Sequence, residues 1–220
     1  MLTVAKAIHQ RRSIRSFRPD PVPKEYILEM LEAARLAPSS GNRQPWRFLV
    51  VTEPEEKKML RQMALEQEFV ETAPVVFICA TDLRAYSRRA SALRFQEFVD
   101  FGVLETLSGR FADPEYRKEY ESRAEIDQAT LVRMAMANTY IAIEHLVLTA
   151  TALGLGSCWI GAVDQSDEVR NFFNLPKTVI ILALIPVGYP TKVPPPRPRI
   201  PLKEILLRPL PTNPPEAGTA

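Results

Sequence analysis

Three arginines and two serines fall within six positions near the start of the chain, in residues 11–17 (RRSIRSF). Arginine carries a planar fork of N–H donors that matches phosphate oxygens, and it stays charged at working pH. The hydroxyl of Ser13 and the backbone amides of this loop can add donors around the same anion. The segment is therefore a candidate phosphate site. A solvated basic loop that complements the dipole of a preceding helix is the competing interpretation, and this segment alone leaves both open.

Side chains that could act as nucleophiles or metal ligands lack the partners that such chemistry needs. His9 and His145 are the only histidines, and no carboxylate or thiol cluster stands at ligand spacing, so we expect no metal. The GLG sequence at 154–156 follows a helical pattern, and Trp159 occupies the place of a third glycine, which argues against a dinucleotide motif. We therefore expect no catalytic side chain, and a cofactor that carries the chemistry.

Composition is typical of one globular domain. The chain has 220 residues, of which 46% are hydrophobic and 25% charged. The formal net charge of +2 argues against a nucleic-acid partner. Cys79 and Cys158 form no CxxC pair, which favours reduced thiols and a cytoplasmic protein. The first residues show no signal-peptide core, and the most apolar stretch, 132–153, includes the charged Glu144, so we expect a buried helix and no membrane partner.

Hydrophobic periodicity predicts alternating helices and strands around these features. Helices are expected over residues 3–10, 23–37, 54–70, 127–153 and 164–173, and strands over 46–52, 74–81, 157–163 and 178–187. The strands at 74–81 and 178–187 are almost entirely apolar, which is typical of strands buried on both faces.

Two regions do not follow the pattern of the remaining domain. Residues 82–127 alternate helical patches with charge clusters, and we interpret them either as a surface excursion or as a lid over a site. Residues 188–220 form a proline-rich arm, which we expect to be stiff and extended. The apolar residues at 202–207 predict that the arm packs onto something, such as a partner subunit.

Four stretches, in the right order, resemble the nitroreductase family of FMN-dependent oxidoreductases. They are residues 11–17, 37–46 (APSSGNRQPW), 154–161 (GLGSCWIG), and 188–190 (GYP) with the PRPR at 196–199. The second stretch is the most specific of the four. Together they span nearly the whole chain and leave 82–127 as an unmatched gap, so we expect one domain over residues 1–220.

The resemblance implies which residues bind FMN. In that pattern Arg11, Ser13 and two arm arginines meet the phosphate, Arg15 approaches the N1–O2 edge of the ring, and the backbone amide of Gly161 faces N5. The loop at 39–42 is expected to reach the flavin from the other subunit. The full set of expected cofactor-binding residues is Arg11, Arg12, Ser13, Arg15, Pro38, Ser39, Ser40, Asn42, Gln44, Trp159, Ile160, Gly161, Arg197 and Arg199.

The resemblance also implies fold and assembly. We expect an α+β fold in which helices flank a mixed central sheet on both faces, as an α-β-α sandwich. The chain is expected to form a homodimer with the helix at 132–153 in the interface. The arm at 188–220 would then be swapped onto the partner.

The activity implied is an FMN-dependent oxidoreductase that takes hydride from NADH or NADPH at flavin N5 and then reduces a second small substrate by a ping-pong mechanism. Nitroaromatics, quinones, enones and free flavin are the candidate oxidants, and Phe111 is our candidate substrate-facing residue. The alternatives are a flavin-fragmenting or dehalogenating relative, and a non-catalytic protein that binds flavin or another anion. The deiodinase branch is disfavoured because its Glu, Tyr and Lys lid set is not found before Pro74.

Overall fold

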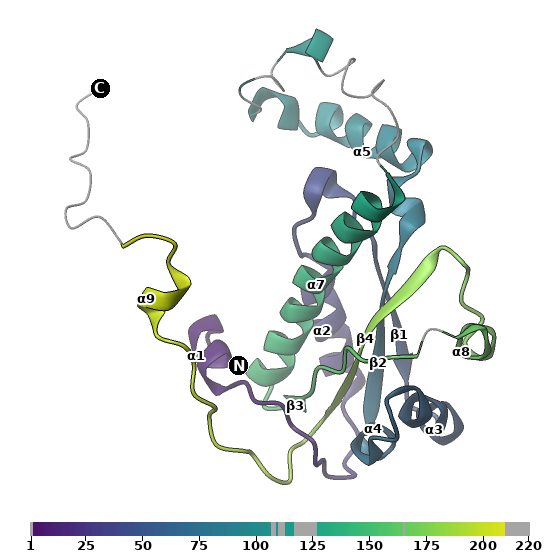
Figure 1. Cartoon of the computed structure of the whole chain (residues 1–220), viewed down its shortest axis with the longest axis vertical. Helices are drawn as coiled ribbons and strands as arrows, with labels where there is room; N and C mark the ends of the chain where they lie inside the picture. The colour runs from purple at the N-terminus through teal and green to yellow at the C-terminus, as the bar shows by residue number, and fades with distance from the viewer. Residues whose placement is uncertain (1, 107–108, 110–112, 117–126, 165, 210–220) are drawn as a thin grey trace.

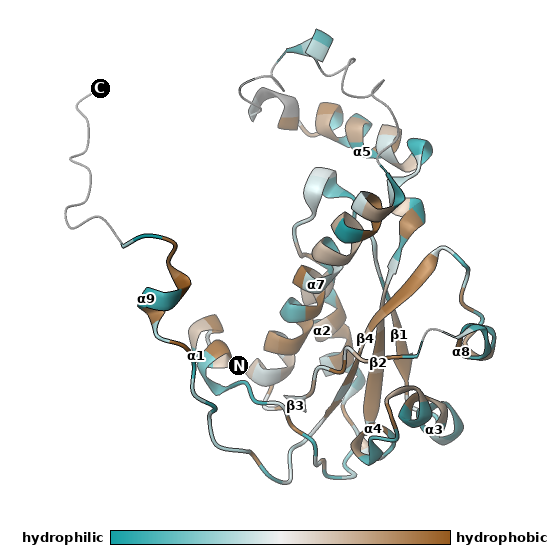
Figure 2. Cartoon of the chain, in the orientation of Figure 1, coloured by the Kyte–Doolittle hydropathy of each residue, from teal (hydrophilic) through white to brown (hydrophobic). Residues whose placement is uncertain are grey.

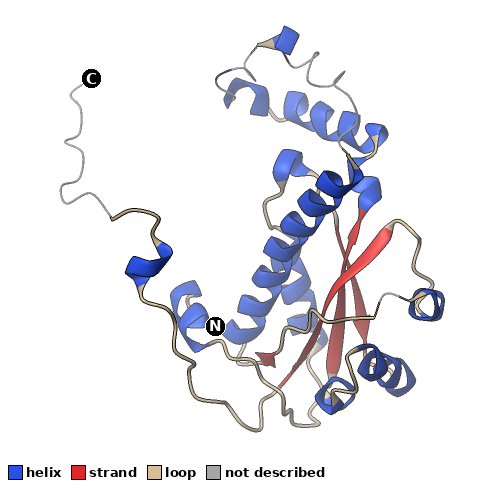
Figure 3. Ribbon diagram, in the orientation of Figure 1, coloured by secondary structure: helices blue, strands red, loops and turns tan. Residues whose placement is uncertain are grey.

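The chain folds into a central sheet covered by helices on both faces (Figures 1 and 3). A computed structural model describes residues 2–106, 109, 113–116, 127–164 and 166–209. Among these residues no helix is both long and apolar enough to cross a membrane. Two appendages leave the body, the excursion that begins after β2 and the C-terminal arm. The expected α+β sandwich is therefore confirmed.

The sheet is built from four strands in the order β1-β2-β4-β3. Their bounds are Trp46–Val51, Val75–Asp82, Gly156–Ser157 and Val179–Gly188 for β1 to β4. The residues of β2 are all buried and those of β4 almost all, because helices cover both faces, as their apolar sequences predict. All pairings between these strands are antiparallel, so the expected mixed sheet is corrected. The parallel contact among the described residues is an isolated bridge between Ser13 and Ser157.

Helices α2 (Lys24–Arg35) and α7 (Gln128–Ala152) cover one face of the sheet. Asp127 caps α7 by accepting a hydrogen bond from the N–H of Thr130, which satisfies one of the free N–H groups at the helix start. The core on this side is formed by apolar side chains of α2, α7, β2 and β4. Figure 2 shows that this apolar interior extends along α7 and the strands. The buried helix expected at 127–153 is confirmed.

The opposite face is covered by α3 (Pro54–Met63), α4 (Glu68–Thr72) and α8 (Asp167–Phe172). The expected single helix at 54–70 is wrong, because Leu65 and Glu66 both have positive φ angles, of 56° and 60°, which ends the helical path. The strand expected at 157–163 is also shorter: after β3 the N–H of Cys158 donates to the carbonyl of Pro186, and Ile160 forms an isolated bridge to Leu184.

The remaining elements lie at the periphery. Four short ones are α1 (Val4–Gln10), α9 (Leu202–Ile205) and the 3-10 helices η1 (Ser40–Asn42) and η2 (Leu83–Tyr86). Helix α5 (Arg88–Asp100) and η3 (Val103–Thr106) belong to the excursion, and α5 begins where Ser87 accepts a hydrogen bond from the N–H of Ala90. Figure 1 shows α5 beyond the N-terminal end of α7, whereas α9 lies on the side of α1 that is away from α7. The loop after α1 and the loop that includes η1 hold the candidate site residues described next.

Candidate functional site

The arginine segment lies extended against the edge of the sheet. The N–H of Ile14 donates to the carbonyl of Ser157 in β3 at 2.9 Å, and that of Arg18 donates to the carbonyl of Tyr189 at 2.8 Å. Ile14 is buried and anchors the segment. Because side chains alternate along an extended chain, Ser13 and Arg15 point away from the core side that Ile14 occupies.

Arg11, Ser13 and Arg15 come together around Cys158. Burial raises the pKa of the Cys158 thiol, while the nearby charges of Arg15 and Arg11 and a hydrogen bond with Ser13 act in the opposite direction. Neither arginine forms an ion pair with a carboxylate in the described part of the chain. The arrangement therefore presents two positive charges and a hydroxyl at one edge of the sheet, which suits an anion from outside the chain.

Arg12 lies apart from this group. Its guanidinium donates to the carbonyls of His9 and Arg11 at 2.8 Å each, where α1 ends. Its side chain also lines a cavity of about 460 Å³ together with Ile14 and Pro196 of the arm. The structure thus brings the arm next to the arginine segment, and it commits the Arg12 guanidinium to backbone carbonyls at the end of α1.

Trp159 connects this group to α7. Its ring centroid lies 6.0 Å from that of Tyr140, and its side chain lies close enough to Glu144 to affect the pKa of that carboxyl. Partial burial raises the pKa of Glu144, although the Arg11 charge, the Trp159 hydrogen bond and the His145 charge oppose this. We did not select Glu144 from the sequence as a site residue. The feature of the sequence that could have identified it is a carboxylate in a largely apolar helix.

The next two residues differ in their surroundings. Ile160 is buried, and its backbone exchanges hydrogen bonds with Leu184 at 3.1 and 3.0 Å. Gly161 is exposed, and a Cβ built there would meet no atom within 4 Å. The backbone at Gly161, three residues after Cys158, is therefore open to solvent.

The loop at 38–44 is fixed by its own side chains. Ser39 Oγ accepts the N–H of Gln44 at 3.0 Å, and Gln44 Nε2 donates to the carbonyl of Asn42 at 3.3 Å. Pro38 and Ser40 are exposed. Asn42 faces the excursion, because its Nδ2 donates to Glu97 of α5 at 3.0 Å.

A second cavity, also of about 460 Å³, lies between this loop and the excursion. Its lining residues are Asn42, Gln44, Arg94, Glu97, Phe98, Phe101 and Val103. Phe98 of α5 and Phe101, the residue that follows its last turn, thus supply two aromatic side chains to this cavity. Phe111 lies outside the described residues.

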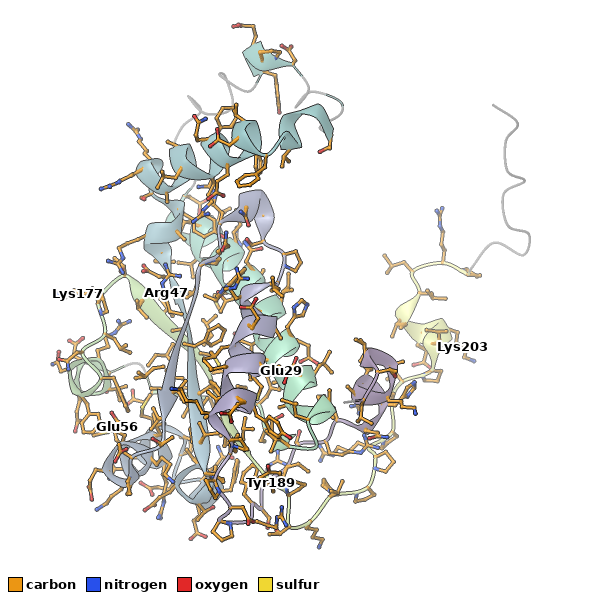
Figure 4. The ribbon with its side chains drawn as sticks, turned by 180° about the vertical axis from the view of Figure 1, so that it is seen from behind. Glu29, Arg47, Glu56, Lys177, Tyr189 and Lys203 are labelled. Atoms are coloured by element: carbon orange, nitrogen blue, oxygen red, sulfur yellow. The ribbon has the colours of Figure 1, made fainter. Side chains whose placement is uncertain are left out.

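The arm arginines are exposed. Arg197 and Arg199 form no ion pair with a described carboxylate, and the Arg199 guanidinium donates to the carbonyls of Arg197 and Pro198. Figure 4 shows Tyr189 at the base of the sheet, where the arm begins, and Lys203 on α9, away from the sheet layers. The single chain thus leaves both arginines available to an added anion.

These features suit FMN better than a metal. The phosphate of FMN needs cations without carboxylate partners, which Arg11, Arg15, Arg197 and Arg199 supply. No group of three or more His, Cys, Asp or Glu side chains that could hold a metal ion occurs in the part of the chain that the structure describes.

Comparisons with known proteins agree on one family. The model of the nitroreductase family matches residues 8–189. A Thermus thermophilus protein named NADH dehydrogenase is 35% identical over 207 residues, which cover 94% of this chain and 96% of that protein. An FMN reductase [NAD(P)H] of Bacillus subtilis is 30% identical, over 93% of this chain and 73% of its own length. A protein from Exiguobacterium sibiricum, described as a nitroreductase and solved in complex with FMN, superposes with a TM-score of 0.76 at 26% identity, over 94% of this chain and 97% of that one.

Proposed function

Since the chain belongs to the nitroreductase family, as an FMN-dependent NAD(P)H oxidoreductase, we propose that it reduces a small aromatic or quinone-like second substrate by a ping-pong mechanism. The observation that carries the proposal is the group of Arg11, Ser13 and Arg15 around Cys158, beside the open edge at Gly161. When bound, FMN supplies the redox step, accepting hydride from NADH or NADPH and passing it to the second substrate.

The residues of this chain would bind and orient the cofactor. Arg11, Ser13, Arg197 and Arg199 would hold the phosphate through charge-assisted hydrogen bonds. Arg15 would place a fixed positive charge against the ring, where it stabilises added negative charge. The backbone at Gly161 would offer its N–H to the ring on the open side. No acid or base side chain is required of the chain in this proposal.

An aromatic second substrate is supported by the cavity beside α5. Its wall combines Phe98 and Phe101, which offer faces for a flat molecule, with Asn42 and Gln44 of the loop expected to reach the flavin. Glu97 and Arg94 on the same wall form an ion pair, so the wall adds no net charge. The cavity therefore favours a flat, uncharged oxidant such as a quinone or a nitroaromatic.

A homodimer with swapped arms is part of the proposal. Large apolar side chains are exposed on α1, α2, α7 and the arm, and they include Val4, Leu28, Ile141, Leu202 and Leu207. Leu207 is 106% exposed, although the apolar tail was expected to pack onto a surface. A partner subunit that covers these faces would remove this apolar area from water, and the pattern supports the arm as the crossing element (Figure 2). The buried free thiols of Cys79 and Cys158 support a cytoplasmic location.

Anaerobic spectroscopy tests the proposal. The purified protein should carry a flavin absorption band that NADH or NADPH bleaches and that a quinone or a nitroaromatic restores. Steady-state rates with both substrates varied should give parallel double-reciprocal lines, as a ping-pong mechanism requires. A bound flavin that neither nicotinamide bleaches would contradict the proposed reaction and indicate a flavin-binding protein without reductase activity. Intersecting lines would contradict the ping-pong order alone.

A further inference from the structure

The loop that includes η1 has an unusual backbone. Gly41, Asn42 and Gln44 have φ angles of 58°, 52° and 49°; Gly and Asn tolerate this left-handed region, whereas the side chain of Gln44 disfavours it. Such a conformation costs free energy and persists only where surrounding contacts enforce it. Besides the hydrogen bonds within the loop, the contacts that hold it come from α7 and from the excursion.

Asn138 of α7 supplies the first of these contacts. The residue is 7% exposed, and its Oδ1 accepts the N–H of Ser40 at 3.2 Å. Its Nδ2 donates to the hydroxyl oxygen of Tyr86 at 2.7 Å. A backbone N–H can only donate, so the amide oxygen must face Ser40 and the amide nitrogen must face Tyr86. Both ends of this buried amide are therefore committed, one to the loop and one to η2.

The connection returns to the loop through Tyr86. The guanidinium of Arg43 lies 5.5 Å from the centre of the Tyr86 ring, and the same group donates to Ser91 of α5. Ser40, Asn138, Tyr86 and Arg43 thus form a closed ring of contacts that starts and ends in the loop. The ring ties the loop to both α7 and the start of the excursion.

We propose that Asn138 is a positioning residue of the cofactor site: by bridging Ser40 and Tyr86 it holds the left-handed loop in the conformation in which Ser39 and Ser40 reach the flavin. The proposal rests on the proposed FMN site, because it assigns this loop a contact with the flavin. It also gives the excursion a role besides covering the substrate, since Tyr86 and Ser91 belong to its first part. Asn138 itself touches neither cofactor nor substrate in this assignment.

The test compares FMN binding in the wild type and four variants. Asn138→Leu removes both hydrogen bonds at similar volume, Tyr86→Phe removes one and keeps the ring under Arg43, and the double variant combines them. Thr139→Val is the matched control, because the Thr139 hydroxyl bonds the Ala135 carbonyl within its own helix. For each holoprotein we would measure the FMN dissociation constant, the visible circular dichroism of bound FMN, and the thermal midpoint.

We expect Asn138→Leu and Tyr86→Phe each to weaken FMN binding about tenfold and to alter the dichroism, as loss of one well-placed hydrogen bond would. The double variant should bind no more weakly than Asn138→Leu alone, because the two side chains act through one connection. Thr139→Val should keep the wild-type dissociation constant.

The outcomes separate this proposal from the proposed function. Wild-type protein that binds FMN and is reduced by a nicotinamide establishes the function independently of the variants. If both single variants then keep the wild-type dissociation constant and dichroism while the thermal midpoint falls, Asn138 is structural only and the positioning role is wrong. Fully additive losses in the double variant would also overturn it. Wild-type protein without affinity for FMN would overturn both.

Discussion

Ile14 of the arginine segment packs directly on Gly156 of β3. A Cβ added to Gly156 would lie 2.5 Å from Ile14 Cγ1 and 2.9 Å from its Cβ, closer than non-bonded carbon atoms come. Ile14 stands between Ser13 and Arg15, so this close approach sets how near the sheet the expected phosphate-binding residues lie. Gly156 is therefore needed for the position of Arg11, Ser13 and Arg15, because a larger residue there would displace Ile14.

Gly156→Ala should displace the arginine segment. We expect a loss of about 1–3 kcal/mol in the free energy of unfolding, because the added methyl overpacks a closed contact, and weaker FMN binding. Urea unfolding and an FMN titration measure the two effects. A double-mutant cycle with Ile14→Ala is the control: the pair should cost less than the sum of the single changes, since the shorter side chain makes room. Additive costs would show that the predicted contact is not the cause.

Arg199→Ala should weaken FMN binding about tenfold or more, because one charge-assisted hydrogen bond to the phosphate is lost, on the order of 1.5–3 kcal/mol. Fluorescence titration of the apoprotein gives the dissociation constant. Lys203→Ala removes a charge from the same arm, on α9, and should leave the constant unchanged. Equal effects of the two substitutions would mean that the arm acts through its total charge and that Arg199 is not a specific ligand.

Two truncations separate the roles of the arm. A chain ending at Pro201 keeps Arg197 and Arg199 but lacks the apolar α9, so we expect a dimer that dissociates at least about tenfold more readily, with less apolar surface covered. A chain ending at Gly188 also lacks both arginines and should be colourless and prone to aggregation. Light scattering across a concentration series measures the assembly. A flavin-bound monomer from the shorter chain would contradict the swapped dimer.

The raised pKa of Glu144 predicts a pH effect on stability in the apoprotein. A carboxyl whose folded pKa exceeds its unfolded value, about 4.3, stabilises the fold at lower pH, and this contribution is lost as pH rises through the folded pKa. Glu144→Gln removes the ionisation and can still accept the Trp159 hydrogen bond. The stability of the variant relative to wild type should therefore increase as pH rises from about 4 to 7. Urea unfolding across that range tests this, and a constant difference would contradict it.

Phe98→Ala should separate the two half-reactions. Phe98 lines the cavity beside α5, so its loss should raise the Michaelis constant for an aromatic oxidant about three- to tenfold, as expected for one lost ring contact. Anaerobic reduction by the nicotinamide should change less. Phe95→Ala, on the same helix but not on the cavity wall, is the matched control. Equal loss in both half-reactions would show that the cavity is not specific to the oxidant.

Local sequence was sufficient for most elements of the body. The apolar runs of β2 and β4 and the long apolar helix α7 are recognised from their own residues, because burial on several sides requires apolar side chains at nearly every position. The break between α3 and α4 was missed. Leu65 and Glu66 adopt positive φ, and neither residue type signals this conformation.

For the site, the residue types alone show which chemistry is available: arginines and a serine in one short segment, small polar residues in a loop, and two more arginines in a proline-rich arm. Which of these residues meet follows from the fold. The fold commits Arg12 to backbone carbonyls at the end of α1, brings Cys158 and Glu144 to the group of Arg11, Ser13 and Arg15, and joins the loop to α5. The reason is physical: side-chain chemistry belongs to each residue alone, whereas contact depends on strand order and on which face an extended segment turns to the sheet.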